Sequence, residues 1–549
     1  MNLNIRITWP AWAWINSTAD ILSSIFAKLW YDLITEIKYE SRIKWWVNYF
    51  DVNISDLNEK FISKKVDILV CFNNKSLESQ IPNLKENWTI IANSKNISPL
   101  LSQEKGLILQ LEIADKYDNT YLLWILGKYL SIPKDILLEE IWEIFSKKWE
   151  EIVNQNKNII EEIWENYKLP KKSEFEIKKI WEENQLIYGN KAVAKWAIAW
   201  WLEFYSAYPM TPASSILTEI INDWSIKYIQ NEDEIAVIMS ALWASYTWAR
   251  AMTWTSGWWF ALMTEALGFS VQAEIPITVV LSQRAWPSTW TPTYHEAADL
   301  NFALNPTFWD FEHIVLYPSN LEEAYYFAWL ALNLADKYQT QVIYLIDKQA
   351  SEMFWTISEL KTPKIERWEM LENPPSDYKR YEITKNWISP RVKVWTKNGD
   401  FIASSYEHDE YWATTENPET KKAMTEKRTK KLNNFYEKEW FKWFEVINPN
   451  AKKMIIATSF TSYTAKKFVK DNPEFGLIIV KFLKPLDKRL KDEIIWKQEI
   501  IFVENNYSGQ LEKYLTNEFS LNCVEWLKIS HLRKYDLMPF YLEDFWEMK

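Results

Sequence analysis

Residues 275–283 have the sequence IPITVVLSQ, and residues 284–290 continue with RAWPSTW. A short, strongly apolar run that is rich in β-branched residues predicts a β-strand. The Pro, Ser and Thr residues that follow predict a loop directly after it. In open α/β sheets, ligands bind in the crevice outside the carboxyl ends of the strands. The stretch therefore predicts a strand that ends at a ligand-binding edge, with Arg284 at that edge.

Similar apolar runs recur along the chain and predict further strands. They lie at residues 2–8, 67–72, 107–111, 342–346, 454–458, 477–480 and 499–503. Segments with helical character separate them, such as those within residues 132–165. Strands that alternate with helices favour parallel sheets. The pattern predicts the α/β class.

Changes in composition along the chain predict three domains. We place the first at residues 1–185, the second at 186–378, a connecting segment at 379–445 and the third at 446–549. Residues 150–183 are rich in Lys, Glu and Asn and form the first joint. The connecting segment is rich in charged residues and Pro and has no long apolar run. A length of 549 residues fits about three domains at roughly 100–200 residues each.

The overall composition excludes several classes of protein. A net charge of −11 argues against nucleic-acid binding. Cys71 and Cys523 are the two cysteines, too few for a disulfide scaffold or for the four ligands of an iron–sulfur cluster. No run of 18 apolar residues predicts a membrane span, and the first residues (MNLNIRIT) do not resemble a signal peptide. We expect a cytoplasmic protein.

The chain has 8 Gly and 35 Trp residues, whereas about 38 Gly are expected at the usual ~7%. Many Trp residues stand where turns need glycine, for example Trp9, Trp12 and Trp14 and the doublets at 200–201 and 258–259. We hypothesise that most of them are glycines encoded by UGA, which some bacteria translate as glycine. The alternative is a truly Trp-rich protein, such as a carbohydrate-binding protein.

Under the recoding hypothesis, residues 9–14 (WPAWAW) become a glycine-rich turn between a predicted strand and a predicted helix. Such a turn lets backbone N–H groups reach a phosphate at the helix N-terminus. Its spacing is not that of the dinucleotide-binding motif. A tight turn without a ligand is an equally good interpretation.

Four motifs in the second domain, with Trp interpreted as Gly where the family has Gly, resemble one protein family. They are YPMTPASS at residues 208–215, NEDE at 231–234, TSGWW at 255–259 and QRAWPSTWTPT at 283–293, followed by Asp299 and Leu300. They are similar to the alpha subunits of 2-oxoacid:ferredoxin oxidoreductases, of the 2-oxoglutarate type. The main departure is Trp at nearly every glycine of the family, which recoding explains.

The resemblance extends over most of the chain. Residues 9–12 and 41–46 resemble the family's gamma domain, residues 386–391 and 407–410 its connecting segment, and residues 504–510 its transketolase C-terminal-like domain. The resemblance implies a gamma domain, a pyrimidine-binding thiamine diphosphate domain and a transketolase C-terminal-like domain. It also implies oxidative decarboxylation of a 2-oxoacid by thiamine diphosphate, with acyl transfer to coenzyme A and electron transfer to ferredoxin.

Glu234 is the candidate catalytic residue. The pyrimidine ring of thiamine must be protonated at a ring nitrogen, and a buried carboxyl group is a suitable partner for that nitrogen. The position of Glu234 before a helix rich in small residues matches the family. The alternative is that Glu232, Asp233 and Glu234 only decorate a helix N-terminus, where carboxylates are favoured.

The resemblance implies that Thr211 and Arg284 bind the carboxylate of the oxoacid. Prolines on both sides of Thr211 restrict its backbone, and an Arg offers two parallel donors to a carboxylate. A turn Thr and a structural ion pair are the alternatives. The candidate cofactor-binding residues are Tyr208, Pro209, Thr255, Ser256 and Gly257. For the last three, a simple helix cap is the alternative.

Other reactive side chains are weaker candidates for a functional role. His295 and His408 are possible proton shuttles, but a lone histidine usually has a structural role. We expect Cys71 and Cys523 to be buried or incidental, and we predict no metal site.

The chain lacks a Mg2+ and diphosphate motif of the G-D-G…N type, even with Trp interpreted as Gly. The resemblance therefore implies a beta subunit that carries Mg2+, the diphosphate end and the 4Fe–4S clusters, in an αβ heterodimer or its dimer. The alternatives are the pyrimidine-binding subunit of another thiamine enzyme, such as a transketolase or an E1-type dehydrogenase, and pyruvate as substrate. The sequence does not determine the oxoacid or the direction of the reaction.

Overall fold

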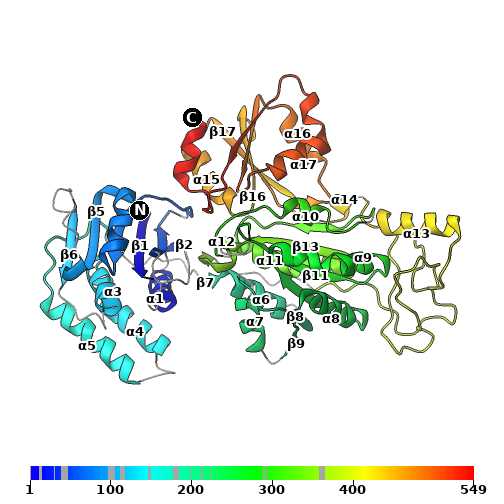
Figure 1. Cartoon of the computed structure of the whole chain (residues 1–549), viewed down its shortest axis with the longest axis horizontal. Helices are drawn as coiled ribbons and strands as arrows, with labels where there is room; N and C mark the ends of the chain where they lie inside the picture. The colour runs from blue at the N-terminus through cyan, green and yellow to red at the C-terminus, as the bar shows by residue number, and fades with distance from the viewer. Residues whose placement is uncertain are drawn as a thin grey trace. The chain divides into compact units, whose positions relative to one another are not determined.

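A computed structural model describes residues 2–10, 15–29, 31–38, 47–57, 59–96, 106–111, 118–145, 150–175, 177, 185–199, 201–211, 214–223, 225–287, 291, 293–308, 310–357, 365–433, 435–439 and 441–549. The chain forms two compact units (Figure 1). The first comprises Met1–Tyr188, Glu352–Lys361 and Phe540–Lys549, and the second Gly189–Ser351 and Thr362–Pro539. Residues 11–14, 41–46 and 288–290, which carry parts of the motifs named above, lie outside the described residues.

The first unit contains an eight-stranded mixed sheet of order β6-β5-β4-β1-β3-β2-β14-β7. Its strands are β1 Asn2–Pro10, β2 Asp32–Lys38, β3 Val47–Ser55, β4 Val66–Cys71, β5 Leu84–Asn93, β6 Leu107–Leu111, β7 Gln185–Tyr188 and β14 Phe354–Ile357. β1, β4, β5 and β6 are parallel, whereas β3 is antiparallel to both β1 and β2. The sheet is therefore not wholly parallel, because β3 inserts between β1 and β2, a long-range pairing that no local pattern encodes.

Helices pack on this sheet around one hydrophobic core, which includes Ile5, Phe26, Phe50, Leu122 and Ile160. They are α1 Ile15–Lys28, α2 Asn74–Gln80, α3 Asp118–Tyr129, α4 Lys134–Phe145 and α5 Glu150–Asn166. The last two confirm the helical character predicted within residues 132–165.

The second unit contains a seven-stranded sheet of order β18-β12-β13-β11-β10-β8-β9. Its strands are β8 Phe204–Ala207, β9 Lys227–Gln230, β10 Ala251–Thr255, β11 Ile277–Gln283, β12 Ile314–Leu316, β13 Gln341–Asp347 and β18 Phe482–Lys484. All are parallel except β18. β11 is the strand predicted at residues 275–283, and it is buried along its whole length.

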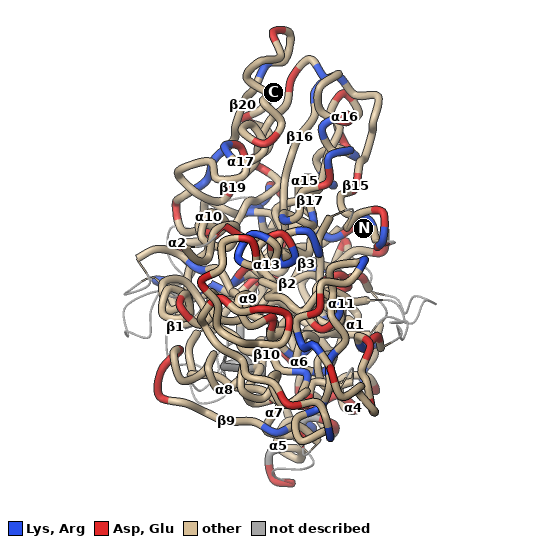
Figure 2. Tube along the Cα trace, turned by 90° about the vertical axis from the view of Figure 1, so that its right-hand side faces the viewer, with Lys and Arg blue, Asp and Glu red and all other residues tan. Residues whose placement is uncertain are grey.

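The helices of this part connect the parallel strands or follow them. They are α6 Gly189–Ala199, α7 Ser214–Ile221, α8 Glu234–Tyr246, α9 Thr264–Gln272, α10 Leu300–Leu304, α11 Leu321–Tyr338 and α12 Lys348–Glu352, with α13 Pro418–Lys430 and α14 Phe435–Lys438 in the connecting segment. Acidic and basic residues are interspersed along the trace (Figure 2). Among the described residues, no helix combines the length and the apolar content that a membrane crossing requires.

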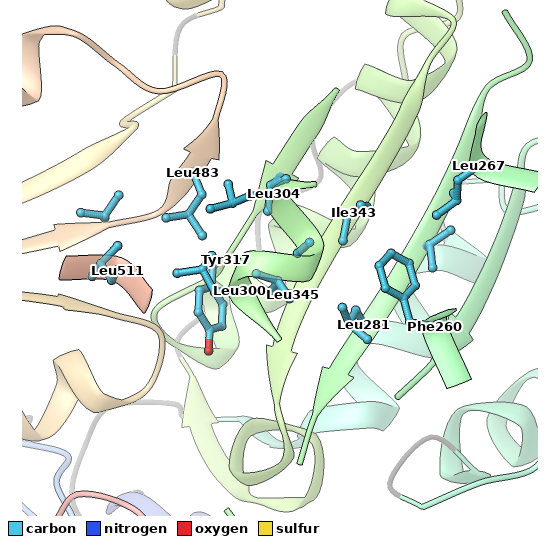
Figure 3. Packing of buried hydrophobic residues seen from close by; sticks show 14 of the residues in the cluster. Phe260, Leu267, Leu281, Leu300, Leu304, Tyr317, Ile343, Leu345, Leu483 and Leu511 are labelled. Carbon is cyan, nitrogen blue, oxygen red and sulfur yellow. The ribbon is translucent and has the colours of Figure 1, made fainter. Parts of the chain in front are cut away.

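A five-stranded sheet of order β15-β17-β16-β19-β20 completes the second unit. Its strands are β15 Phe444–Ile447, β16 Lys453–Thr458, β17 Phe475–Val480, β19 Glu499–Glu504 and β20 Lys528–Arg533, with helices α15 Thr461–Asp471, α16 Arg489–Ile495 and α17 Gln510–Phe519. Leu483 and Leu511 belong to the same hydrophobic cluster as Leu300 and Leu345 (Figure 3). The predicted second and third domains thus share one core, while the exact boundaries stay predictions.

Several Trp residues have an unusual backbone conformation. The φ angle is positive at Trp201, Trp248, Trp387, Trp395 and Trp412, with values between 62° and 114°. This region of φ favours glycine and disfavours a bulky side chain. Trp395 is also 94% exposed, an unusual position for an indole. These features support the hypothesis of glycine recoding, which stays a prediction.

Candidate active site

The candidate site residues lie at one edge of the seven-stranded sheet. β8, β10, β11 and β13 are parallel neighbours, so their carboxyl ends meet at the same edge. Thr211 follows β8, Ser256 follows β10 and Arg284 follows β11. The structure thereby brings together segments that are more than 70 residues apart in sequence. The prediction that Arg284 lies at a strand end is confirmed.

Arg284 contacts the Thr211 segment directly. Its Nη1 donates a hydrogen bond to the carbonyl oxygen of Thr211. The Arg284 side chain is buried, and its Nε has no hydrogen-bond partner. Burial lowers the pKa of the guanidinium, and the nearby Asp299 opposes this shift. A buried cation with an unused donor can accept an anionic group at this edge. Thr211 itself is half-buried.

Glu234 is the first residue of α8. Its neighbours show whether it is needed to cap the helix or is available for another role. Asp233 is exposed and caps the helix, because its carboxylate accepts from the Ala236 N–H at 2.7 Å. Glu232 is also exposed. Glu234, in contrast, is 2% exposed, and its Oε1 has no hydrogen-bond partner. The helix N-terminus therefore has its cap already, and Glu234 is left with a buried, unused acceptor.

Burial raises the pKa of Glu234, against a smaller lowering by its own backbone N–H. A carboxyl group in a low-dielectric setting is favoured in its neutral form unless a partner stabilises the charge. Such a group is suited to share a proton with a nitrogen base.

Thr255, Ser256 and Gly257 are fully buried at the end of β10. The hydroxyl groups of Thr255 and Ser256 have no hydrogen-bond partner. Ser256 occupies the N-cap position of the short 3-10 helix Gly257–Met263, yet its side chain makes no capping bond. The helix-cap alternative is therefore wrong for Ser256. Buried polar groups are normally paired, so each unpaired hydroxyl is open to a ligand.

The remaining sequence candidates are placed as follows. Tyr208 is half-buried and packs against the core, and Pro209 is exposed. His408 lies 1% exposed, with its ring nitrogens 3.0 and 3.2 Å from the carbonyl oxygens of Asp409 and Gln272, so its role is structural. The backbone N–H of His295 donates to the Leu537 carbonyl at 3.2 Å.

The two cysteines differ in environment. Cys71 is buried and burial raises the pKa of its thiol to about 12, which makes it unreactive, whereas Cys523 is exposed. Among the described residues, no group of three or more His, Cys, Asp or Glu is arranged to hold a metal ion.

A hydrogen-bonded network beside Arg284 was not foreseen. Asp347, at the end of β13, accepts hydrogen bonds from the hydroxyls of Tyr317 and Ser459. Gln283 donates to the Tyr317 hydroxyl at 2.5 Å and accepts from the Asp299 N–H at 3.0 Å. The network joins residues more than 170 positions apart, so no local pattern in the sequence predicts it. The sequence offers one signal for it, the single Asp347 at the end of an apolar strand.

Two family models match parts of this chain. Residues 195–427 match the family model described as pyruvate flavodoxin/ferredoxin oxidoreductase, thiamine diP-bdg, and residues 15–165 match pyruvate ferredoxin/flavodoxin oxidoreductase. The 2-oxoacid:ferredoxin oxidoreductase subunit alpha of Sulfolobus sp is 28% identical over 93% of this chain and 92% of its own length. The 2-oxoglutarate synthase subunit KorA of Methanocaldococcus jannaschii is 31% identical over 53% of this chain and 80% of its own length.

Among solved structures, the 2-oxoglutarate:ferredoxin oxidoreductase of Magnetococcus marinus superposes with a TM-score of 0.90 at 26% identity, covering 100% of this chain and 98% of that one. The fold and the site edge thus define a subunit of a thiamine-dependent oxidoreductase. The chain belongs to the family of 2-oxoacid:ferredoxin oxidoreductase alpha subunits. The resemblance and the α/β class are confirmed, and a transketolase or E1-type subunit is not supported.

Proposed function

We propose that this chain binds the pyrimidine end of thiamine diphosphate and the carboxylate of a 2-oxoacid, in an enzyme that forms acyl-CoA and reduces ferredoxin. The observation that carries the proposal is the buried Oε1 of Glu234, which has no hydrogen-bond partner. Glu234 follows β9, a parallel neighbour of β8, so it lies at the same sheet edge as the buried Arg284. Thiamine diphosphate, when bound, supplies the carbanion chemistry of decarboxylation.

The residues at the edge fit this cofactor. Glu234 would hold a proton shared with the pyrimidine ring nitrogen, using Oε1, for which the protein provides no other partner. The hydroxyl of Thr255 or of Ser256, which project to opposite sides of the extended backbone, would donate to or accept from the polar edge of the ring. Gly257, at φ 56°, keeps the backbone free of a Cβ atom here. Tyr208 and Pro209 would complete the wall on the β8 side.

Arg284 and Thr211 would bind the carboxylate of the oxoacid. The bond from Nη1 to the Thr211 carbonyl fixes the guanidinium, and the buried Nε stays without a hydrogen-bond partner. A charge-assisted bond from a fixed, buried Arg orients a carboxylate more strictly than an exposed one would. A 2-oxoacid always carries this carboxylate, so the clamp serves any member of the substrate class.

The rest of the active centre requires a partner. Relatives of this chain are named subunit alpha, which supports a complex of several subunits. Two cysteines cannot ligate a 4Fe–4S cluster. We assign Mg2+, the diphosphate and the clusters to a beta subunit, in an αβ heterodimer or its dimer, with ferredoxin as the electron acceptor. A cytoplasmic location is part of this proposal.

We propose 2-oxoglutarate as the oxoacid and coenzyme A as the co-substrate, with pyruvate as the alternative substrate. The support comes from relatives: the Magnetococcus marinus enzyme was solved with 2-oxoglutarate, coenzyme A and succinyl-CoA bound, and the Methanocaldococcus jannaschii relative is named a 2-oxoglutarate synthase subunit.

The test is an assay of the chain co-purified with its beta subunit, supplied with thiamine diphosphate, Mg2+, coenzyme A and a viologen acceptor. We expect faster reduction with 2-oxoglutarate than with pyruvate. Glu234→Gln should lower kcat by at least about 100-fold, the usual scale of acid–base catalysis. Glu232→Gln is the matched control, because Glu232 is exposed two positions away. Equal activity of both variants would refute the assignment of Glu234.

A further inference from the structure

Asp299 stands at the N-cap position of α10 but does not cap the helix. An Asp at this position normally accepts a hydrogen bond from an N–H in the first turn. Here the side chain makes no such bond, and Oδ2 is buried without a partner. The capping position therefore does not explain why a carboxyl group is present.

The backbone on both sides of Asp299 is held firmly. Its own N–H donates to Gln283 Oε1 at 3.0 Å. Gln510, at the start of α17, donates to the Ala298 carbonyl at 2.7 Å and accepts from the Asn301 N–H at 2.9 Å. These bonds fix the place of the carboxyl group, and Gln283 directly precedes Arg284 in the sequence.

Asp299 and Arg284 interact through their charges. Asp299 raises the pKa of the guanidinium, and Arg284 lowers the pKa of the carboxyl group. Neither Nε of Arg284 nor Oδ2 of Asp299 has a hydrogen-bond partner. The two groups are thus close enough to sense each other, while these atoms remain open to a third group.

We propose that Asp299 is a positioning residue that acts as an exchangeable counter-ion of Arg284. In weakly alkaline solution it is ionised while the guanidinium has no ligand, and it takes up one proton from solvent when the substrate carboxylate binds Arg284. When the carboxylate leaves as CO2, Asp299 returns that proton to solvent. The inference rests on the proposed function, since it takes Arg284 as the carboxylate clamp.

The surroundings of Asp299 favour its neutral form. Burial raises its pKa from the ordinary 3.8 to about 7, with a further contribution from Glu296. Both protonation states are therefore accessible near neutral pH. Asp347 accepts a hydrogen bond from Gln283, the residue that also binds the Asp299 N–H. Glu504 accepts from Asn506, which also donates to the Ala297 carbonyl. Among the described residues, Arg284 and Glu296 act on Asp299 through their charges, whereas Asp347 and Glu504 are connected to its surroundings only through Gln283 and Asn506.

The experiment measures KM for the oxoacid against pH with the complete complex. The wild type should show a constant KM below about pH 7 and a rise of about tenfold per pH unit above it, because one proton is linked to binding. Asp299→Asn cannot ionise, so its KM should stay flat over the same pH range. Glu296→Gln is the control: it should keep the rise but move its onset to lower pH. A flat wild-type profile, or an unchanged rise in Asp299→Asn, would overturn the proposal.

A second measurement needs no variant of Asp299. Calorimetric titration of the wild-type complex with oxalate, in two buffers of different ionisation enthalpy at pH 8, should show uptake of nearly one proton per oxalate. The variant Arg284→Met distinguishes a wrong assignment of the carboxylate clamp from a wrong role of Asp299. If it binds oxalate as tightly as the wild type, the clamp itself is wrong. If it loses binding but the wild type takes up no proton, the clamp stands and the role of Asp299 is wrong.

Discussion

Gln283 and Asp347 lie opposite each other in register at the carboxyl ends of β11 and β13, with 3.4 Å between Gln283 Nε2 and Asp347 Oδ1. Asp347 also accepts from the hydroxyls of Tyr317 and Ser459, and Ser459 follows β16 of the last sheet. One buried carboxylate thus links the strand before Arg284 to the C-terminal part of the second unit.

Replacing Asp347 by Asn should destabilise the protein by about 1–3 kcal/mol, because an amide N–H would then face hydroxyl groups that now donate. The measurement is the free energy of unfolding in urea. Asp471→Asn is the control, since Asp471 forms a surface pair with Lys467 that is expected to contribute no more than about 1 kcal/mol. Equal losses in the two variants would contradict the stabilising role of the network.

Glu274 forms a buried ion cluster with the connecting segment. Its carboxylate lies 2.5 Å from Lys427 Nζ and 3.1 Å from Lys431 Nζ, and all three side chains are buried. Glu274→Gln should cost about 3–5 kcal/mol, because it leaves two buried ammonium groups without their counter-ion. Exposed Glu426→Gln, which breaks an i,i+4 surface pair, is the matched control.

The same cluster predicts a pH dependence. Although burial alone would raise it, the pKa of Glu274 is held well below its ordinary value of 4.5 by Lys427, Lys431 and Arg380. A carboxyl group with a lowered pKa in the folded state contributes stability above its unfolded pKa, and this is lost as the pH falls. The unfolding free energy of the wild type should therefore fall below about pH 4.5, and that of Glu274→Gln should fall less steeply. Parallel curves would contradict the assignment.

The C-terminal residues Phe540–Lys549 belong to the first unit. The Tyr541 hydroxyl lies 3.1 Å from that of Tyr49 and donates to Glu36 Oε1 at 3.0 Å, in a buried setting. Tyr541→Phe should cost about 1–3 kcal/mol, because a buried acceptor loses its donor. Tyr507→Phe, at a hydroxyl-bearing ring that is 71% exposed, should be nearly neutral. Limited proteolysis checks the result, and equal resistance of the two variants would contradict it.

Glycine recoding predicts the mass of the protein purified from its native host. We expect an intact mass well below that of the printed sequence, and glycine in the peptides that contain positions 201, 248, 387, 395 and 412, where φ is positive. Weak Trp fluorescence should accompany it. Trp at these five positions in the peptide spectra would refute recoding there.

Local patterns in the sequence were sufficient for the α/β class and for the strand that precedes Arg284. Apolar runs, turn residues and the motifs around Thr211, Glu234 and Ser256 involve neighbouring positions, so they are visible in one dimension. The same patterns did not reveal that β3 lies antiparallel between β1 and β2, or that β14 and the C-terminal tail join the first unit.

The sequence by itself determined which residue types were available for binding a carboxylate and a pyrimidine ring. Only the tertiary structure decided which of three successive acidic residues is buried with an unused oxygen. It also decided that the Asp299 backbone is anchored by Gln283 and Gln510, where its charge acts on Arg284. The physical reason is that burial, hydrogen-bond satisfaction and charge coupling depend on segments that are distant in sequence and that only folding brings into contact.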